Sequence, residues 1–271
     1  MSEYNQVRYW VEALPKMGIY TFSLSDAINQ FSNKPSIQVK NALNRLVRAK
    51  RIASVWRGFY AINLPEYGFK GIIPPTEYID HLMKYLKKDY YIATLSAAAL
   101  HGASHQKPQI FTFVSNQIMH PKEKNETRLE PLLRKRIPHK YIERKNVRSG
   151  TINISMPLLT ALDLILYPTK SGGISNVATI IAELSENIDL DIIDNDFFHY
   201  APISAFQRLG YVLDEILDEH DLSMHLLEKA NKASVVFRKT PLVTYNNISC
   251  VGLQYNKKWK IVVNEEVDTE I

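Results

Sequence analysis

The segment SIQVKNALNRLVRAKRIASVWRGFYAI, residues 36–62, decides how the first part of this chain folds. Its first half spaces apolar residues as a helix does, and its second half holds two strand-like runs around a glycine. We therefore predict a helix from Ser36 to about Lys50, with Ser36 as its cap, followed by a hairpin. The hairpin strands are expected at residues 52–55 and 59–62, with Gly58 in the turn.

The predicted helix has two chemically different faces when it is projected at about 100° per residue. One arc is apolar and holds Val39, Ala42, Leu43, Leu46 and Val47. The opposite arc has no acidic residue and holds Lys40, Asn41, Asn44, Arg48 and Arg51, flanked by Gln38 and Arg45. Amide side chains can bond to adenine edges, and arginine and lysine can bond to guanine edges and phosphates. The polar arc therefore suits the major groove of double-stranded DNA.

Two shorter helices precede this one. The first is indicated by apolar residues at i, i+3, i+4 and i+7, namely Val7, Trp10, Val11 and Leu14, and it is expected to end at Pro15. Ser23 and Asp26 have the spacing of a capping box at the start of the second helix.

Three helices and a hairpin with Arg57 at its tip are typical of a winged helix-turn-helix. This interpretation predicts that the DNA-contacting residues are Ser36, Gln38, Lys40, Asn41, Asn44, Arg45, Arg48, Arg51 and Arg57. The alternative for the same domain is protein contact, because winged helices also serve that purpose.

Charge is distributed unevenly along the 271 residues, whose overall net charge is +5. Residues 1–65 carry nine basic and three acidic residues, and residues 105–150 carry 11 basic and four acidic residues. Residues 151–271 carry nine basic and 17 acidic residues. This asymmetry predicts a polyanion-facing N-terminal part, while solvated surface charge is the alternative for either basic block.

Residues 66–75 are rich in proline and glycine, so we expect a linker between a domain of residues 1–65 and a second domain of residues 76–271. The second domain is expected to mix helices with a small sheet. The predicted helices lie near residues 79–86, 91–100, 157–166, 177–184 and 205–217, and the predicted strands near residues 109–114, 140–143, 151–155, 248–254 and 259–263. The predicted fold class is thus α+β, an N-terminal winged helix-turn-helix followed by a mixed α/β C-terminal domain.

The sequence offers poor support for an enzyme. Glu143 and Lys145 have the Glu-x-Lys form of a metal-dependent nuclease, but no aspartate lies between Asp89 and Asp163 to complete the cation site. A cluster of aspartates at positions 189, 191, 194 and 196 is more typical of a solvated loop than of a nucleotidyltransferase. The eight histidines and the single cysteine, Cys250, have no metal-binding spacing. We expect no catalysis, no cofactor and no metal.

The chain begins without a signal peptide pattern, and its longest apolar stretches are far shorter than the roughly 18 residues that span a bilayer. We therefore expect a cytoplasmic protein that makes no membrane contact.

Several stretches, taken in order, resemble the AbiEi-type antitoxins of bacterial abortive-infection systems. They are residues 57–60 (RGFY), 95–102 (LSAAALHG), 160–164 (TALDL), the pair Gly172-Gly173, and residues 208–211 (RLGY). The resemblance covers residues from about 20 to 217.

The resemblance implies a transcriptional autorepressor whose winged helix binds inverted repeats in its own promoter. It also implies a second domain that counteracts a nucleotidyltransferase-type toxin, functionally and without the need for a stable complex. Two other hypotheses stay open: a protein- or RNA-interaction module using residues 105–150, and a nuclease using Glu143 and Lys145.

Overall fold

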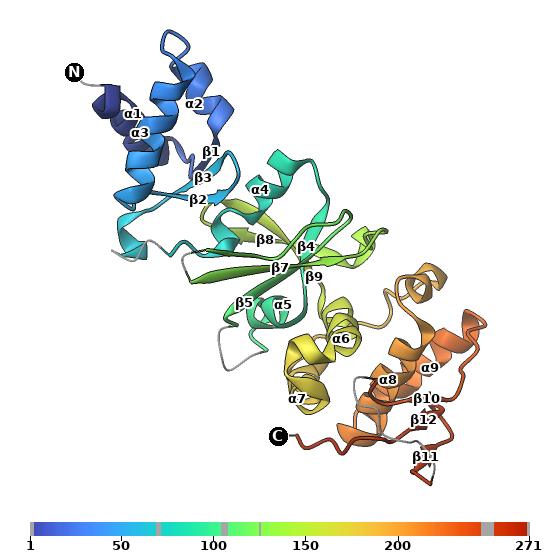
Figure 1. Cartoon of the computed structure of the whole chain (residues 1–271). Helices are drawn as coiled ribbons and strands as arrows, with labels where there is room; N and C mark the ends of the chain where they lie inside the picture. Colours follow the sequence, from blue (N-terminus) through green and yellow to red (C-terminus); the bar gives the residue numbers. More distant parts are fainter. Residues whose placement is uncertain (1–2, 69–71, 104–107, 125, 245–251, 270–271) are drawn as a thin grey trace.

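The computed structural model describes residues 3–68, 72–103, 108–124, 126–244 and 252–269. It is a mixed α+β structure in which helices pack around three separate sheets (Figure 1). No helix within these ranges is both long and apolar enough to cross a membrane. The mixed character of the fold agrees with the sequence prediction.

The N-terminal unit packs three helices on one face of a three-stranded antiparallel sheet of order β1-β3-β2. Its elements are α1 (Glu3–Ala13), β1 (Thr21–Ser23), α2 (Leu24–Gln30), α3 (Ser36–Arg48), β2 (Ile52–Trp56) and β3 (Phe59–Ile62). A 3-10 helix (Leu14–Met17) with Pro15 near its start follows α1, which ends as predicted before the proline. Gly58 turns the hairpin with a φ of +72°, a backbone conformation that glycine adopts without steric cost.

The two helix starts in this unit have different outcomes. α2 begins with the predicted capping box: the Ser23 hydroxyl accepts from the Asp26 amide at 3.1 Å, and the Asp26 carboxylate accepts from the Ser23 amide at 2.7 Å. Ser36 does not cap α3, because Pro35 occupies the cap position and Ser36 is the first helical residue. The helix also ends at Arg48 rather than near Lys50, which has a φ of +53°.

The central part of the molecule is a six-stranded mixed sheet of order β6-β7-β5-β4-β9-β8. Its strands are β4 (Tyr90–Ile92), β5 (Ile110–Ser115), β6 (Lys122–Lys124), β7 (Thr127–Leu133), β8 (Ile142–Val147) and β9 (Gly150–Ser155). β5–β7 and β4–β9 are parallel pairs, and the other pairs are antiparallel. α4 (Ile79–Leu86) packs on one face of this sheet. α5 (Thr94–His101) lies between the sheet and the helices α6 and α7 (Figure 1).

The prediction of one helix over residues 91–100 is wrong in its first part. Residues 90–92 form the strand β4, and α5 starts only at Thr94. The aromatic and β-branched triplet Tyr-Tyr-Ile favours a strand, and it gains backbone partners in β5 and β9 that the local pattern does not reveal. β6, β7 and the later helix α9 (His220–Lys232) were not predicted at all.

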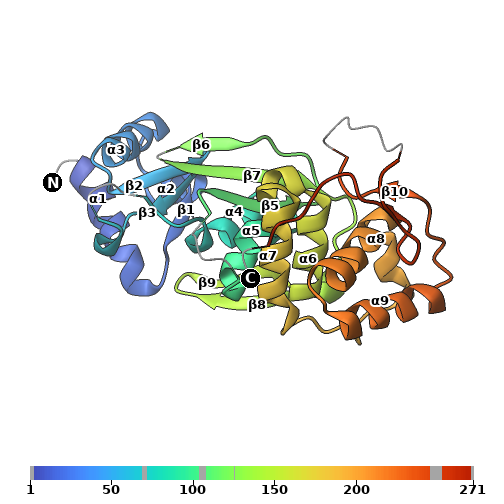
Figure 2. The ribbon, with the colours of Figure 1, turned by 90° about the horizontal axis from the view of Figure 1, so that it is seen from below.

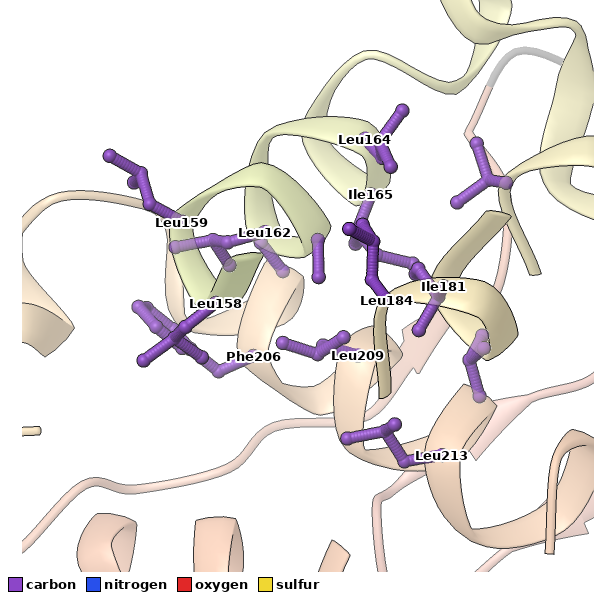
Figure 3. Packing of buried hydrophobic residues seen from close by; sticks show 14 of the residues in the cluster. Leu158, Leu159, Leu162, Leu164, Ile165, Ile181, Leu184, Phe206, Leu209 and Leu213 are labelled. Atoms are coloured by element: carbon purple, nitrogen blue, oxygen red, sulfur yellow. The ribbon is translucent and has the colours of Figure 1, made fainter. Parts of the chain in front are cut away.

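Helices form a thick layer beyond the sheet (Figure 2). They are α6 (Pro157–Leu166), α7 (Gly173–Ser185), α8 (Ile203–Tyr211), a π-helical turn (Val212–Ile216) and α9. Figure 3 shows leucines and isoleucines of α6 and α7 packed against Phe206 and Leu209 of α8. α6 matches its predicted bounds, as expected for an apolar run that opens with proline.

The C-terminal segment closes this layer with a small sheet of β10 (Thr240–Pro241), β12 (Ile261–Val262) and β11 (Tyr255–Asn256). Gly210 of α8 lets the Trp259 ring approach so closely that an added Cβ would lie 2.1 Å from it. The strand predicted at residues 259–263 is shorter than expected, because only Ile261–Val262 form β12. Most of the strand predicted at residues 248–254, together with Cys250, lies outside the described residues.

The hairpin of the N-terminal unit belongs to two cores at once. Tyr60 and Ile62 face α1–α3, whereas the alternate residues Phe59 and Ala61 face α4 and the six-stranded sheet. This alternation explains why all four residues of β3 are buried. The N-terminal unit is consequently joined to the central sheet by a shared apolar cluster.

Candidate nucleic-acid interface

The helix α3 presents its polar arc to solvent. Val39, Leu43 and Leu46 of the opposite arc are at most 1% exposed, which fixes the rotation of the helix on α1 and α2. Figures 1 and 2 both show α3 on the side of the N-terminal unit that lies away from the six-stranded sheet. The exposed residues of the arc are Lys40, Asn41, Asn44, Arg45 and Arg48.

The cations of α3 have no carboxylate partner in the described part of the chain. Two acidic residues of the N-terminal unit are engaged elsewhere, because Glu12 pairs with Arg8 at 2.8 Å and Asp26 caps α2. Lysine and arginine without such partners keep their full charge available for an external anion. The arc is therefore a free basic and amide surface.

The other predicted contact residues lie around this arc in different settings. Ser36 is exposed at the first position of α3, and Gln38 is half-buried. Arg51, which the sequence placed on the arc of the helix, is exposed three residues beyond the end of α3, because the helix stops at Arg48. Arg57 is exposed at the hairpin tip, but both of its neighbours contact the central part of the molecule. The Trp56 ring lies 4.5 Å from the Lys122 ammonium, and Gly58 lies beside the Tyr85 hydroxyl. The tip is thus anchored rather than freely projecting.

A cavity of about 700 Å³ opens beside the C-terminal end of α3. Its lining combines apolar residues from three segments, including Val11, Leu46 and Ile62, with Arg48 and Arg51 of the predicted contact surface. The sequence pattern gave no sign of this hollow, because it forms between α1, α3 and the segment after β3.

The second basic block, residues 105–150, differs from α3 because acidic partners neutralise much of it. Its ion pairs are Arg128–Glu130, Arg134–Asp163, Arg136–Asp196, Lys140–Asp194 and Arg148–Glu66. Three of these partners come from residues 151–271, the acidic part of the sequence. Four of the five pairs join the block to acidic residues outside it, so much of its cationic excess is balanced by other parts of the chain.

The buried pair in this block could not be found from the sequence. Arg134 donates to Asp163 at 2.6 Å and to the Tyr91 hydroxyl at 2.7 Å, and that hydroxyl donates to Asp163 at 3.0 Å. Asp163 is fully buried and Arg134 nearly so. Burial alone would lower the pKa of Arg134, but the adjacent carboxylate outweighs it and raises that pKa. The three groups hold β4, the end of β7 and α6 together.

The aspartate cluster at residues 189–196 also has structural partners. Asp194 accepts from the Phe197 amide at 3.1 Å, from the Tyr141 hydroxyl at 2.9 Å and from Lys140 at 2.6 Å. Asp191 lies near the side chains of His225 and Lys229. These contacts agree with the interpretation of the cluster as a loop.

The proposed nuclease pair lies on the edge strand β8. Lys145 donates to the Leu100 carbonyl, and Glu143 lies 3.8 Å from the His101 ring. Among the described residues, no group of three histidine, cysteine or acidic side chains is placed to hold a metal ion. Within the described ranges, the structure therefore places a histidine near Glu143 and Lys145 but no second carboxylate that would complete a cation site.

A second buried charge lies in the C-terminal layer. Asp214 accepts from Ser223 and Trp259 at 2.9 Å each, and Lys258 lies 2.8 Å away. Burial opposes ionisation of Asp214, but these donors prevail and lower its pKa to about 2. Asp214 thereby ties the C-terminal segment to α8 and α9.

Two of the stretches that carry the family resemblance, residues 95–102 and 208–211, make structural contacts in this fold. Ala97 and Ala98 of α5 are fully buried, and the His101 ring lies 2.7 Å from the Ser155 carbonyl. Arg208 donates to the Pro241 carbonyl at 3.0 Å. These contacts join α5 to β9, and α8 to β10.

Comparison with solved structures identifies a related fold. The crystal structure of the RV2827C protein from Mycobacterium tuberculosis is similar, with a TM-score of 0.65 and 13% sequence identity. The match covers 96% of this chain and 90% of that one. At this identity the similarity concerns the fold. Comparison with curated proteins gives no match.

Comparison with protein families bears on the central part of the chain. Residues 91–215, from β4 to the π-helical turn, match the family model described as the AbiEi antitoxin C-terminal domain. The resemblance inferred from the sequence is thus confirmed over these residues, and the match supports the role of antitoxin in a toxin–antitoxin system. Over residues 91–215 the chain is therefore similar to the AbiEi antitoxin C-terminal domain family.

Proposed function

We propose that this chain is an antitoxin that binds promoter DNA through α3, represses its own operon and counteracts a nucleotidyltransferase-type toxin. The observation that carries the DNA-binding part is the exposed arc of α3, whose cations have no acidic partner within the described residues. A protein that needed this arc only for solubility would mix both signs of charge there.

The arrangement of the N-terminal unit supports the same proposal. Three helices and a three-stranded antiparallel sheet with a hairpin after the third helix have the order of a winged helix-turn-helix. In that motif the second helix of the helix-turn-helix pair enters the major groove with its N-terminal residues towards the bases. This helix is α3.

We assign roles to the exposed residues by their chemistry. Asn41 and Asn44 read base edges, since an amide can donate to and accept from adenine simultaneously. Lys40, Arg45 and Arg48 contact phosphates or guanine beside them. Ser36, Gln38 and Arg51 extend the contact along the groove, and Arg57 reaches the backbone from the hairpin. Two copies on inverted repeats would place two α3 helices one helical turn apart.

The antitoxin activity is proposed for the part of the chain that holds residues 91–215. The match supports this placement, because it covers the six-stranded sheet and the first helices beyond it. Neutralisation through the effect or the target of the toxin requires no stable complex. An antitoxin that acts in this way needs no docking surface for the toxin.

Mobility-shift titration of the full chain on the DNA upstream of its gene tests the DNA-binding part. We expect Asn41→Ala and Asn44→Ala each to reduce the binding free energy by about 1–3 kcal/mol on DNA that carries the preferred base pairs. Each variant should then bind with the same affinity when those base pairs are changed. Asn231→Ala, at an exposed asparagine of α9, is the matched control and should bind as the wild type does. Binding that is unaffected by both α3 changes would refute the assignment.

A growth assay separates the two activities. The chain is co-expressed with the toxin encoded in the adjacent reading frame, and a promoter reporter is read in the same cells. The double variant Asn41→Ala/Arg48→Ala should lose repression and still restore growth. Loss of growth rescue by a folded double variant would instead place the antitoxin activity in α3.

A further inference from the structure

One exposed apolar residue lies on the polar face of α3. Ile37, in the first turn of the helix, is 60% exposed, whereas Val39, Leu43 and Leu46 are buried. Its side chain therefore adds nothing to the core of the N-terminal unit. An isolated surface isoleucine is ordinary, so its position relative to the other residues of the arc decides what it means.

Ile37 is aligned with the residues that we propose read DNA. Positions 37, 41, 44 and 48 are separated by four, three and four residues, so Ile37, Asn41, Asn44 and Arg48 form one stripe along the helix. The stripe has its apolar member at the N-terminal end and its arginine at the C-terminal end. In a helix-turn-helix the N-terminal end of this helix is the part nearest the base edges.

The major groove contains one apolar feature among the four unmodified bases, the 5-methyl group of thymine. A branched aliphatic side chain can cover that methyl and remove both groups from water. Asparagine at the next positions of the stripe matches adenine. Both preferences select A·T pairs, so the apolar and the amide residues of the stripe favour the same kind of base pair.

We propose that Ile37 contacts a thymine methyl in the same half-site in which Asn41 and Asn44 contact adenine, so that α3 selects a site containing A·T pairs. This inference rests on the proposed DNA-binding function. It adds a specificity-determining residue at the N-terminal end of α3.

The test replaces thymine by uracil, which removes the methyl and leaves the hydrogen-bonding edge unchanged. Duplexes are first selected from a randomised 20-base-pair pool by the full-length wild-type chain. Each dT of a selected duplex is then replaced in turn by dU, and affinity is measured for the wild type and for Ile37→Ala. Ile118→Ala is the control, because Ile118 is 70% exposed and lies outside α3.

We expect one or two positions per half-site at which dU weakens wild-type binding roughly three- to tenfold, the loss of one buried methyl contact. Ile37→Ala should bind the dT and dU duplexes equally at those positions, whereas Ile118→Ala should respond as the wild type does. The same positions should lie beside the base pairs that Asn41→Ala ceases to discriminate.

Different failures identify different errors. The methyl contact is refuted if the wild type enriches duplexes but binds them equally well with dU at every position. It is also refuted if Ile37→Ala loses as much affinity on dU substitution as the wild type does. In both cases the proposal that α3 binds DNA still stands. A loss of affinity by Ile37→Ala that is equal on dT and dU duplexes likewise overturns the contact. If the wild type enriches no duplex from the pool, both the contact and the proposed DNA-binding function are refuted.

Discussion

Residues 1–65, which include the basic arc of α3, and residues 105–150 carry similar net positive charge, but the cations of α3 and those of the second block have different environments in the fold. On α3, Lys40, Arg45 and Arg48 are exposed without acidic partners among the described residues. In the second block, Arg134 and Lys140 pair with aspartates far along the chain. A charge excess counted along the sequence therefore does not tell which cations are available to a partner. Tertiary neighbours decide that availability.

The comparison also bears on the idea that residues 105–150 bind RNA or a protein. Five cations of the block are engaged in ion pairs, so an external polyanion would have to displace carboxylates from them. On α3 a polyanion would displace only water and small ions. The free arc is the better site for nucleic acid.

The largest expected effect is on stability and concerns the buried ion pair of the second basic block. Asp163→Ala should lower the free energy of unfolding by about 3–5 kcal/mol, because it leaves the Arg134 guanidinium buried without its counter-charge. Urea denaturation followed by circular dichroism measures the change.

Asp196→Ala provides the control for that change. Its partner Arg136 is 62% exposed, so solvent screens the pair and the cost should stay below about 1 kcal/mol. Equal small losses in the two variants would mean that the buried pair does not hold the sheet to α6.

A second effect concerns acid stability. The pKa of Asp214 is lowered to about 2 in the folded chain, against about 3.9 for an unfolded aspartate. The stabilisation from its ionised form, about 2 kcal/mol, is present above pH 4 and is lost as the pH falls towards 2. Asp214→Asn should therefore be less stable than the wild type at pH 6, and the difference should shrink between pH 4 and pH 2.

Urea denaturation at several pH values measures this difference. Asp218→Asn, a change at an exposed residue nearby, should show little difference from the wild type at pH 6. A gap between Asp214→Asn and the wild type that stays constant down to pH 2 would contradict the assignment of the effect to this carboxylate.

The third prediction concerns DNA binding by the exposed arc of α3. Arg48→Ala should weaken binding to all DNA sequences by roughly five- to tenfold at moderate salt and reduce the slope of log K against log salt by about 1. Arg136→Ala removes the same charge from the paired block and should leave both quantities unchanged. Identical salt slopes for wild type and Arg48→Ala would remove the phosphate contact from the proposal.

The smallest effect concerns a cation of the second block that lies against the N-terminal unit. Lys122→Ala should cost about 0.5–1 kcal/mol of stability, because its ammonium lies over the Trp56 ring. Lys122→Arg should keep most of that interaction, and differential scanning calorimetry compares the two. A loss that arginine does not restore would point to a contact other than the cation–π pair.

Local patterns predicted the elements whose causes are local. The capping box of Ser23 and Asp26 and the start of α6 at Pro157 depend on residues within one turn, and both were predicted correctly. The rotation of α3 was predicted as well, since its buried residues are the apolar arc.

Elements that depend on distant partners were missed. β4 pairs with residues 113–115 and with Ile154, so the strands that complete its hydrogen bonding lie far from residues 90–92 in the sequence. β7 contains Pro131 and charged residues, which obscured its alternation. The pairing of Arg134 with Asp163 spans 29 positions and has no sequence signature. The exposure of the α3 arc could be predicted, whereas its binding to DNA stays a prediction.

The double-sided burial of β3 has a consequence for dissecting the chain. Phe59 and Ala61 contribute to the cluster that contains Ile79, Leu82 and Met83 of α4. A fragment that ended at residue 65 would leave this face uncovered, and a fragment that began at residue 76 would lack part of its own interior. Genetic truncation at the linker therefore damages both products, and point substitutions on α3 are the cleaner way to separate their activities.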